Sequence, residues 1–411
     1  MTSPFVTQRP LRIVLGAVTY PPDINGAANF AHRLGTGLAR RGHQVHVICH
    51  STDGEPSTTV EEGVTVHRVR SYTAPVATSI RVCAPWQASS AAERLLGEIQ
   101  PDVVHVQSHF YIGRGLINAA RRRGIGLVAT NHFMPENIFG YLNVPRVLQG
   151  AASKILWRNV IKHYSKAETV TAPTPRAVQL LLDNGFADRA MPVSCGIDVE
   201  RYRSRAREYR KHNPDPDIRT ILFVGRLDEE KHLDDLLRAM SLLRTEAKVE
   251  LEIVGDGNRR TVFEELAREL GIADKVRFTG FVSEDELLDA YARADLFCMP
   301  SIAELQSLAT MEAMSAGTPV VLADAMALPH LVEPGRNGWL YPPRDVAALA
   351  KAIDAIIADR TTIDRMGAAG EQLVLKHDIN RVLARFEAIY RHAMNPQESV
   401  EIEALHAELA S

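Results

Sequence analysis

The stretch RTILFVGRLDEEKHLDDLLRAMSLLRTEAKVELEIVGDG (219–257) decides the fold. Its first part, 219–227, reads as a short apolar strand, and apolar positions then recur at helical spacing over 230–244. A second strand pattern follows at 249–257. A strand that leads through a helix into another short strand predicts a parallel sheet with helices on both faces.

The same rhythm extends in both directions along the chain. Downstream, the sequence predicts strands at 275–282, 295–301 and 318–324, and helices at 284–294 and from about Ser307. Upstream, it predicts strands at 11–20, 44–50, 101–109, 126–132 and 169–174, with a helix at 26–43. We therefore expect two similar α/β domains in tandem, with ligands at the carboxyl ends of the strands and a cleft between the domains.

The predicted domain boundaries follow from where the two series stop. The first domain covers 1–200 and the second 219–378, and a charged, proline-bearing stretch at 201–218 separates them as a linker. An amphipathic helix at 379–394 opens a C-terminal tail (379–411). Periodicity leaves open whether this tail packs on its own domain or crosses back to the first.

Composition narrows the class of protein. Of 411 residues, 45% are apolar and 24% charged, which is ordinary globular usage, and the net charge of −3 gives no general attraction for nucleic acid. The four cysteines are far apart without C-x-x-C spacing, which argues against a zinc site or a disulfide framework. With no signal peptide recognised and no apolar run of about 18 residues, we expect a cytoplasmic protein without a metal site.

Three loops after predicted strands carry unusual residues. Gly26 enters a helix, where backbone N–H groups can approach an anion; the alternative is an ordinary tight turn. Arg226 follows a strand and Lys231 opens the next helix, so both cations would suit a diphosphate. The alternative for Lys231 is a solvated helix start paired to an acid. His132 stands just past a strand and is either structural or catalytic.

A fourth loop lies in PSIAELQSLATMEAMSAGTPVV (300–321). Two glutamates, Glu304 and Glu312, stand eight positions apart in an otherwise apolar, small-residue segment. Ser307 and Leu308 begin a helix whose free N–H groups would face an anion. The different depths of the two glutamates predict contacts with different parts of one elongated ligand.

A basic stripe lies further upstream, in RVLQGAASKILWRNVIKHYSKAE (146–168). Lys154, Arg158, Lys162 and Lys166 recur every fourth residue beside apolar positions. One interpretation is an ordinary surface helix. The other is an interfacial element that touches anionic lipid at the inner face of a membrane.

Taken together, these motifs resemble the retaining nucleotide-sugar glycosyltransferases of family 4, with the GT-B fold of two Rossmann-like domains facing across a cleft. The resemblance covers nearly the whole chain. Its most specific parts are FVGRLDEEKHLDDLL, LEIVGDG, RFTGFV, ADLFCMPS and the E-x7-E segment from Glu304 to Glu312, supported by VSCGIDVERY (193–202) and DVVHVQSH (102–109).

The resemblance implies a role for each matched residue. The first domain would bind the acceptor and the second the nucleotide sugar. Arg226 and Lys231 would bind the diphosphate and stabilise it as the leaving group, and Glu304 would contact sugar hydroxyls. Ser307 and Leu308 would offer backbone amides to sugar and phosphate, Glu312 would bind the ribose, and Val282 would lie beside the nucleobase. Gly26 would face the diphosphate from the first domain, and His132 would lie near the sugar and the acceptor. The family commonly has Glu-x-Phe-Gly-Leu at the first glutamate, whereas this chain has Gln306 and Ser307 in the aromatic and glycine places. Gln306 could hydrogen-bond the sugar.

The implied reaction is a metal-independent transfer of a hexose, with retained configuration, from a UDP- or GDP-sugar such as UDP-glucose or GDP-mannose. The acceptor hydroxyl would belong to a lipid, of diacylglycerol or inositol type, or to a small metabolite or glycan. No cofactor is implied, because the nucleotide sugar is a substrate. Three alternatives stay open: a nucleotide-sugar epimerase, a phosphorylase, and a non-catalytic nucleotide-sugar-binding protein attached to a membrane.

Overall fold

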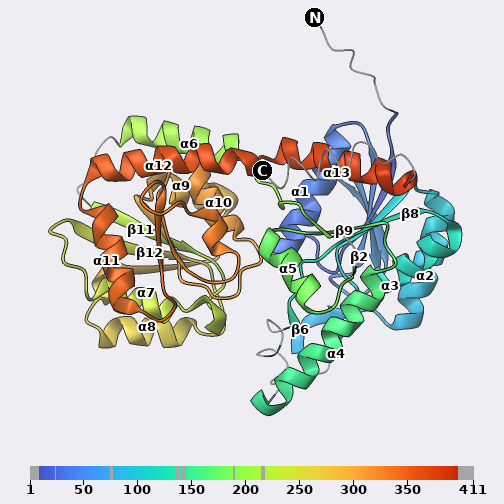
Figure 1. The fold of residues 1–411 in the computed structure, drawn as a ribbon, viewed down its shortest axis with the longest axis horizontal. Coiled ribbons are helices and arrows are strands. Elements are labelled where there is room, and N and C mark those ends of the chain that lie inside the picture. Colours follow the sequence, from blue (N-terminus) through green and yellow to red (C-terminus); the bar gives the residue numbers. More distant parts are fainter. Residues whose placement is uncertain are drawn as a thin grey trace, which may run out of the picture. The chain divides into compact units, whose positions relative to one another are not determined.

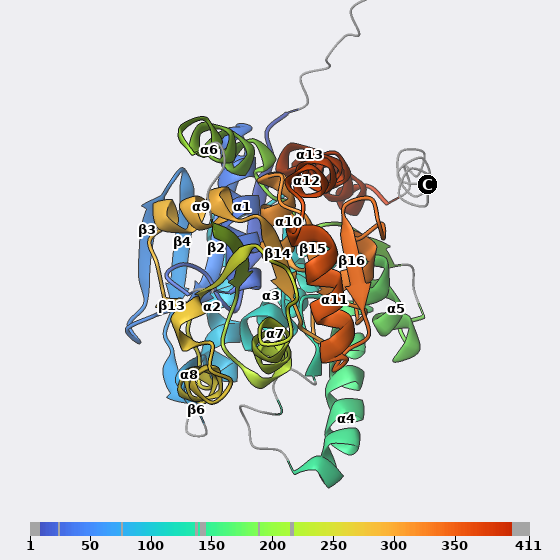
Figure 2. The same ribbon diagram turned by 90° about the vertical axis from the view of Figure 1, so that its left-hand side faces the viewer.

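A computed structural model describes residues 9–23, 25–74, 77–135, 139, 145–187, 190–213 and 218–396. The chain divides into two compact units. Unit 1 holds the residues up to Gly196 together with those from Asn380 onward, and unit 2 holds Ile197–Ile379 (Figures 1 and 2). Each unit is an α/β layer structure with its own sheet.

The sheet of unit 1 has the strand order β10-β9-β8-β7-β1-β2-β4-β3. All neighbouring strands pair in parallel except β3 and β4 at one edge, which are antiparallel. The strands are β1 (Arg12–Gly16), β2 (Gln44–His50), β3 (Ser57–Glu61), β4 (Val64–Val69), β7 (Val103–Val106), β8 (Gly126–Thr130), β9 (Thr169–Ala172) and β10 (Ala190–Pro192), with a separate antiparallel pair β5 (Tyr72–Ala74) and β6 (Ala77–Val82). Every residue of β7 and β9 is buried, as helices on both faces of a parallel sheet require.

The helices of unit 1 lie between successive strands. They are α1 (Gly26–Arg40), α2 (Pro85–Ile99), α3 (Tyr111–Arg123), α4 (Arg146–Tyr164) and α5 (Pro175–Asp183), joined by α13 (Ile379–Met394) from the far end of the chain. Helix α13 is held inside this unit by a hydrogen bond of 2.8 Å between Tyr390 Oη and the buried His105 Nδ1 on β7. Glu387 also pairs with Arg41 and His43 beyond α1. The tail after residue 396 lies outside the described residues.

The sheet of unit 2 is parallel throughout, in the order β13-β12-β11-β14-β15-β16. Its strands are β11 (Ile218–Val224), β12 (Lys248–Val254), β13 (Val276–Gly280), β14 (Leu296–Met299), β15 (Val320–Ala323) and β16 (Gly338–Tyr341). Its helices are α6 (Val199–His212), α7 (Leu233–Met240), α8 (Arg260–Glu269), α9 (Glu284–Arg293), α10 (Leu308–Ser315), α11 (Val346–Ile357) and α12 (Arg360–Val374), with short 3-10 turns η2 (Glu229–Lys231), η3 (Ala273–Lys275), η4 (Leu328–Leu331) and η5 (Leu375–His377). In chain order this is the 3-2-1-4-5-6 arrangement of a Rossmann sheet.

Three local predictions differ from the structure. The linker predicted over 201–218 is instead mostly helix α6, which is fixed to unit 2 by an ion pair of 2.6 Å between Arg205 and Asp289. Lys231 ends the 3-10 turn η2 and does not open a helix, because His232 takes a left-handed backbone conformation before α7 begins. The basic helix ends at Tyr164, so Lys166 lies beyond it.

Candidate active site

The strand order of unit 2 creates one place where neighbouring loops diverge. β11 and β14 are adjacent, but the chain leaves β11 toward β12 on one side and leaves β14 toward β15 on the other. Ligands of such sheets bind outside the carboxyl ends of the strands at this switch point. Arg226 and Lys231 follow β11, and Glu304 follows β14.

The loops after these two strands are joined directly. The backbone N–H of Ile302 donates to the carbonyl of Glu230 at 3.1 Å. Lys231 Nζ then donates to Glu304 Oε1 at 2.5 Å, and both side chains are 13% exposed. The structure thus places the predicted Lys231 and Glu304 in contact, and the acid partner foreseen for Lys231 is Glu304.

Arg226 is the more open of the two cations. Its guanidinium pairs with Asp228 at 2.7 Å and with Glu230 at 3.1 Å while 45% of the side chain stays exposed. The two acids hold the guanidinium beside the end of β11, where it can still meet an incoming anion. The site therefore combines an exposed arginine with a nearly buried lysine.

Two glycines in the loop after β12 lie against the loop that carries Arg226. A Cβ at Gly255 would lie 2.0 Å from the carbonyl oxygen of Gly225, and one at Gly257 would lie 2.6 Å from the Leu227 nitrogen. Gly255 also has a φ of +132°, which side chains rarely tolerate. The VGDG sequence is thus what lets the β11 and β12 loops approach each other.

Helix α10 carries the second half of the predicted donor site. Ser307 is its N-cap, and its hydroxyl accepts from the backbone N–H of Thr310 at 3.3 Å. Leu308 is the first helical residue, and Gln306 is half-buried just before the cap. The helix start predicted at Ser307 is therefore confirmed, with the serine side chain engaged in capping and the first N–H groups at the carboxyl edge of the sheet.

Glu312 lies deeper in the same helix and is 8% exposed. It accepts a hydrogen bond of 2.9 Å from Tyr291 Oη on α9. The tyrosine side chain is fully buried. A phenol that donates to a carboxylate fixes its orientation, so Glu312 is held by α9 as well as by its own helix.

Val282 is half-buried in the short connection between β13 and α9. The next residue, Ser283, caps α9 in a capping box with Glu286, in which each side chain bonds the other residue's backbone N–H. Phe281 beside it is 66% exposed. The capping box fixes this connection, and with it the position of Val282.

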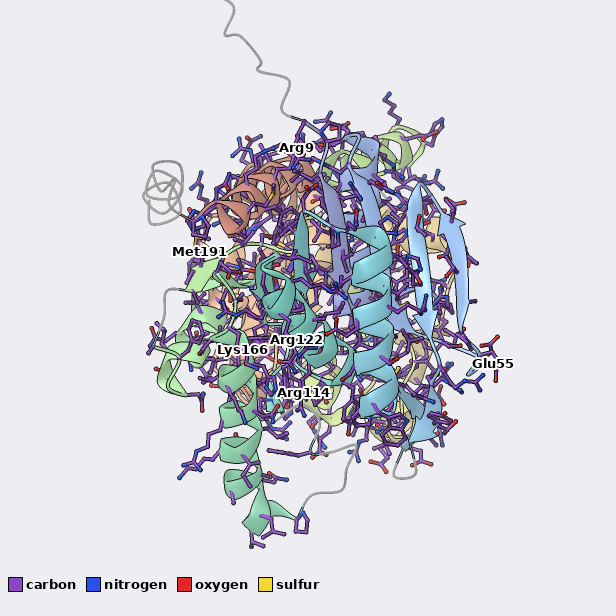
Figure 3. All side chains as sticks on the ribbon, turned by 90° about the vertical axis from the view of Figure 1, so that its right-hand side faces the viewer. Arg9, Glu55, Arg114, Arg122, Lys166 and Met191 are labelled. Carbon is purple, nitrogen blue, oxygen red and sulfur yellow. The ribbon has the colours of Figure 1, made fainter. Side chains whose placement is uncertain are left out.

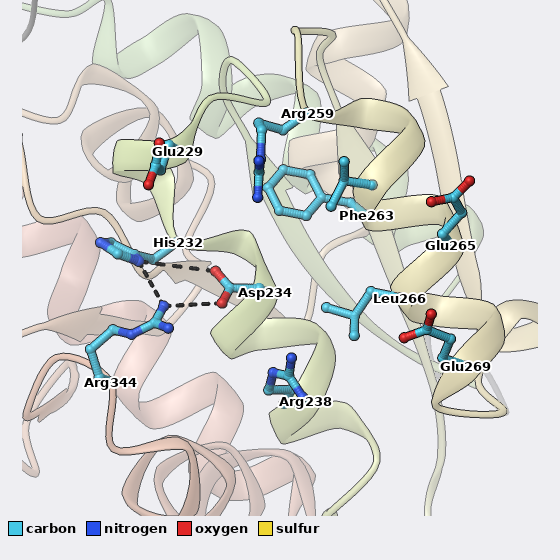
Figure 4. A pocket seen from close by; sticks show the side chains of 11 residues that line it. Glu229, His232, Asp234, Arg238, Arg259, Phe263, Glu265, Leu266, Glu269 and Arg344 are labelled. Carbon is cyan, nitrogen blue, oxygen red and sulfur yellow. Dashed lines mark hydrogen bonds and ion pairs between the residues drawn. The ribbon is translucent and has the colours of Figure 1, made fainter. Parts of the chain in front are cut away.

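A cavity of about 380 Å³ opens on unit 2 beside the site (Figure 4). It shares Glu229 and His232 with the loop that bears Lys231, and Arg344 bridges His232 and Asp234 across it (Figure 4). Its remaining lining residues are Arg238, Arg259, Val262, Phe263, Glu265, Leu266 and Glu269. The cavity borders the switch point without containing Arg226, Lys231 or Glu304.

Two predicted residues, Gly26 and His132, belong to unit 1. Gly26 opens α1 behind the N-cap Asn25, whose side chain accepts from Ala28 N at 2.9 Å. His132 follows β8 and packs against Phe30 with ring centroids 4.6 Å apart. Burial lowers the pKa of His132 to about 4, so its imidazole is neutral at neutral pH.

Two polar residues at the switch point of unit 1 escaped sequence analysis. That point lies between β1 and β7, and Gln107 follows β7, donating its backbone N–H to Gly16 O at 2.9 Å. Gln107 is 5% exposed and His109 is 1% exposed. Within the described part of the chain, neither side chain has a hydrogen-bond partner. The sequence feature that could have identified these two residues is the polar Q-S-H run at the end of an apolar strand.

Three aromatic side chains from different parts of unit 1 surround His109. Its ring centroid is 4.2 Å from that of Phe110, 5.2 Å from Phe133 and 6.1 Å from Tyr164 at the end of α4. Burial lowers the pKa of His109 to about 3, with smaller contributions from His163 and Arg114. A neutral imidazole keeps one donor and one acceptor nitrogen.

The predicted basic stripe is only partly present. Lys154, Arg158 and Lys162 are exposed on α4, but Lys166 donates to Asn118 Oδ1 on α3 at 2.9 Å. Lys166 therefore joins α4 to the body of unit 1 and is not part of the stripe.

Across the described ranges, no three histidine, cysteine or acidic side chains are grouped so that they could hold a metal ion. No helix in the same ranges has both the length and the apolar character needed to cross a membrane.

Comparison with known proteins identifies both halves of the chain. Residues 204–373 match the family model described as glycosyl transferases group 1, and residues 24–201 match that of glycosyltransferase family 4. A GDP-mannose-dependent alpha-mannosyltransferase of Mycolicibacterium smegmatis is 31% identical over 391 residues, which cover 92% of this chain and 98% of that protein. An alpha-monoglucosyldiacylglycerol synthase of Streptococcus pneumoniae is 27% identical, covering 80% of this chain and 75% of the other.

Solved structures confirm the fold. The sucrose-phosphate synthase of Thermosynechococcus elongatus superposes with a TM-score of 0.78 at 21% identity, over 92% of this chain and 98% of that one. This agreement and the two doubly wound sheets confirm the predicted α/β class. The chain therefore belongs to glycosyltransferase family 4, and it is a hexosyltransferase of the GT-B fold that takes its sugar from a nucleotide-sugar donor.

Proposed function

We propose that this protein transfers a hexose from GDP-mannose or UDP-glucose to an acceptor hydroxyl, with retained anomeric configuration and without a metal ion. The proposal rests on two features at the switch point of unit 2, the exposed Arg226 after β11 and the Lys231–Glu304 contact between the loops after β11 and β14. A departing nucleoside diphosphate needs fixed positive charge, and a guanidinium, an ammonium and a helix start supply it there.

Different residues of unit 2 bind different parts of the donor. Arg226 and Lys231 bind the diphosphate and stabilise it as it leaves, while Glu304 orients sugar hydroxyls. The remaining donor contacts are backbone amides of Ser307 and Leu308, the amide of Gln306 for the sugar, Glu312 for the ribose and Val282 for the nucleobase. The roles of Gly26 and His132 in unit 1 stay predictions of the family resemblance.

Retention follows from the chemistry of the leaving group. The transition state separates an oxocarbenium-like sugar from the diphosphate, and a phosphate oxygen on the same face takes the acceptor's proton. The acceptor oxygen forms its bond to the anomeric carbon from the side that the diphosphate leaves. No protein nucleophile is needed on this route.

The similar proteins indicate which donor and which acceptor class to test first. The 31% identical mannosyltransferase makes GDP-mannose the first donor to test. The diacylglycerol-type acceptor named for the streptococcal relative supports a lipid acceptor, reached from a membrane surface that Lys154, Arg158 and Lys162 contact electrostatically. A soluble metabolite or glycan is the competing acceptor class.

A donor screen tests the proposal. Calorimetric titration with GDP-mannose, UDP-glucose and UDP-N-acetylglucosamine identifies the donor, and nucleotide release is then measured in EDTA. Arg226→Ala should lower turnover by about 10²–10³-fold. Arg268→Ala, an exposed arginine on α8, is the matched control and should leave turnover unchanged.

Three results would contradict parts of the proposal. Undiminished turnover in Arg226→Ala removes the leaving-group role, and a strict need for a divalent ion removes the metal-free mechanism. A product whose anomeric coupling shows inversion removes the retaining mechanism. Conversion of the nucleotide sugar without any acceptor would instead indicate an epimerase.

A further inference from the structure

The N-terminal half of α4 exposes apolar side chains. Val147 is 90% exposed, Leu148 55% and Ile155 64%. Single apolar residues on a protein surface are common, but three within one helical stretch form a patch that favours an interaction. The same helix buries Trp157 and Val160 against unit 1, so the exposed side chains lie away from its packed positions.

The position of this stretch follows from contacts with α3. Arg114 donates to Asn159 at 3.2 Å, and Lys166 donates to Asn118 at 2.9 Å, so residue numbers rise together in the two helices. The first residue of α3 is then level with about residue 156 of α4. At 1.5 Å per residue, the part of α4 that precedes this level (146–155) extends roughly 15 Å beyond the start of α3. Figures 1 and 3 show this projection.

Two aromatic side chains lie at the same end of unit 1. Trp86, in the first turn of α2, is 73% exposed, and Tyr111, the first residue of α3, is 36% exposed. The two helices touch near their starts, where a Cβ at Gly115 would lie 2.9 Å from the Ala88 carbonyl oxygen. Tryptophan and tyrosine favour the boundary between lipid tails and water, because each has an apolar ring and a polar group.

The charge of α4 indicates the kind of surface that it fits. The helix sequence RVLQGAASKILWRNVIKHY has no acidic residue. Lys154, Arg158 and Lys162 are exposed, and no ion pair or hydrogen bond to them is found within the described ranges. A surface that is both apolar and cationic complements an anionic lipid interface.

We infer that unit 1 binds anionic membranes end-on, with the α4 tip (147–155) entering the headgroup region and Trp86 and Tyr111 resting at its outer boundary. Interfacial segments enter by about 5–10 Å, which the projection of α4 allows. This inference rests on the membrane contact proposed above. It differs in that the membrane meets the tip of α4 and the aromatic residues Trp86 and Tyr111, and not the side of the helix.

Vesicle flotation combined with tryptophan fluorescence tests the inference. Vesicles of phosphatidylcholine with phosphatidylglycerol should bind the full chain at low salt, and vesicles of phosphatidylcholine alone should bind it more weakly. In a Trp339→Phe background, phosphatidylcholine that carries a nitroxide spin label on its headgroup, added to the anionic vesicles, should quench emission. Replacing Trp86 by phenylalanine in that background should remove the quenching, since Trp157 is buried.

Matched variants locate the contact. Leu148→Asp should weaken vesicle binding at least about tenfold, and Lys154→Gln about fivefold. Leu242→Asp, at a leucine of unit 2 that is 50% exposed, should bind like the wild type. Because all three positions are exposed, each variant should fold, which circular dichroism checks.

Several results would overturn the inference. These are no vesicle binding at low salt, equal binding by Leu148→Asp and wild type, and quenching that persists without Trp86. Self-association of the wild type that Leu148→Asp abolishes, without vesicle binding, would show an interface between copies instead. Nucleotide release from GDP-mannose is measured without vesicles, so failure of the proposed transfer activity is distinguishable from failure of lipid binding.

Discussion

Lys231 and Glu304 form an ion pair of 2.5 Å although 73 positions separate them in the chain. The pair joins the loop after β11 to the loop after β14, on the two sides of the switch point. Each side chain is largely buried, so each charge depends on the other in the absence of a ligand.

We expect this pair to contribute to the stability of unit 2. Lys231→Met leaves the Glu304 carboxylate without its cation and should lower the free energy of unfolding by about 3 kcal/mol. The double variant Lys231→Met/Glu304→Gln should regain part of that loss, because the uncompensated charge is gone. Urea denaturation measures both, and equal stability of the single and double variants would contradict this account.

The hydrogen bond from Tyr291 to Glu312 gives a second prediction. Tyr291→Phe removes one donor to the carboxylate and should cost about 1.5–3 kcal/mol of unfolding free energy. A less fixed Glu312 should also weaken donor binding, measured by calorimetry with the nucleotide sugar found in the screen. Tyr209→Phe, at a half-buried tyrosine of α6, is the control and should leave donor affinity unchanged.

Histidine burial in unit 1 predicts a dependence of stability on pH. His109 has a pKa of about 3 in the folded protein and about 6.5 when unfolded, so the unfolded state binds more protons below pH 6.5. Stability should therefore fall as the pH drops from 6.5 toward 3, and His109 alone should contribute about 2 kcal/mol of loss between pH 7 and pH 5. His109→Phe should flatten the profile by that amount.

The measurement needs a signal from unit 1. Urea denaturation followed by tryptophan emission in a Trp339→Phe background provides it, since Trp86 and Trp157 both lie in that unit. An unchanged pH profile in His109→Phe would show that the pKa of this imidazole is the same in the folded and unfolded states, which contradicts this account.

Gln107 gives a prediction that separates stability from activity. Its buried amide has no partner within the described ranges, so Gln107→Leu should raise the unfolding free energy by about 1 kcal/mol. If the amide binds an acceptor hydroxyl, the same variant should raise the acceptor KM while the hydrolysis of the donor by water persists. A loss of stability would indicate instead that Gln107 bonds an ordered water.

The sequence predicted where most residues of the candidate donor site in unit 2 would lie along its strands and helices. Arg226, Glu304 and Ser307 were predicted at strand ends and at a helix start, and they lie there. Such positions follow from local patterns, because alternating apolar runs, turn residues and caps act over a few neighbouring residues. The role of each residue stays a prediction until the variants are measured.

The sequence did not show the features that depend on packing between distant segments. Local periodicity did not show that the 201–218 stretch forms mostly a packed helix or that Lys166 turns toward Asn118. Nor did it show that the side chains of Gln107 and His109 are buried with no hydrogen-bond partner among the described residues.

The amino-acid sequence by itself determined two runs of alternating strands and helices and the cationic and acidic residues at their ends. Tertiary structure alone decided that β11 lies beside β14, and therefore that Lys231 meets Glu304. It also decided that α13 returns to unit 1, where Tyr390 bonds His105. The physical reason is that hydrophobic patterning specifies which face of an element is buried, whereas its neighbours are selected by packing among all elements at once.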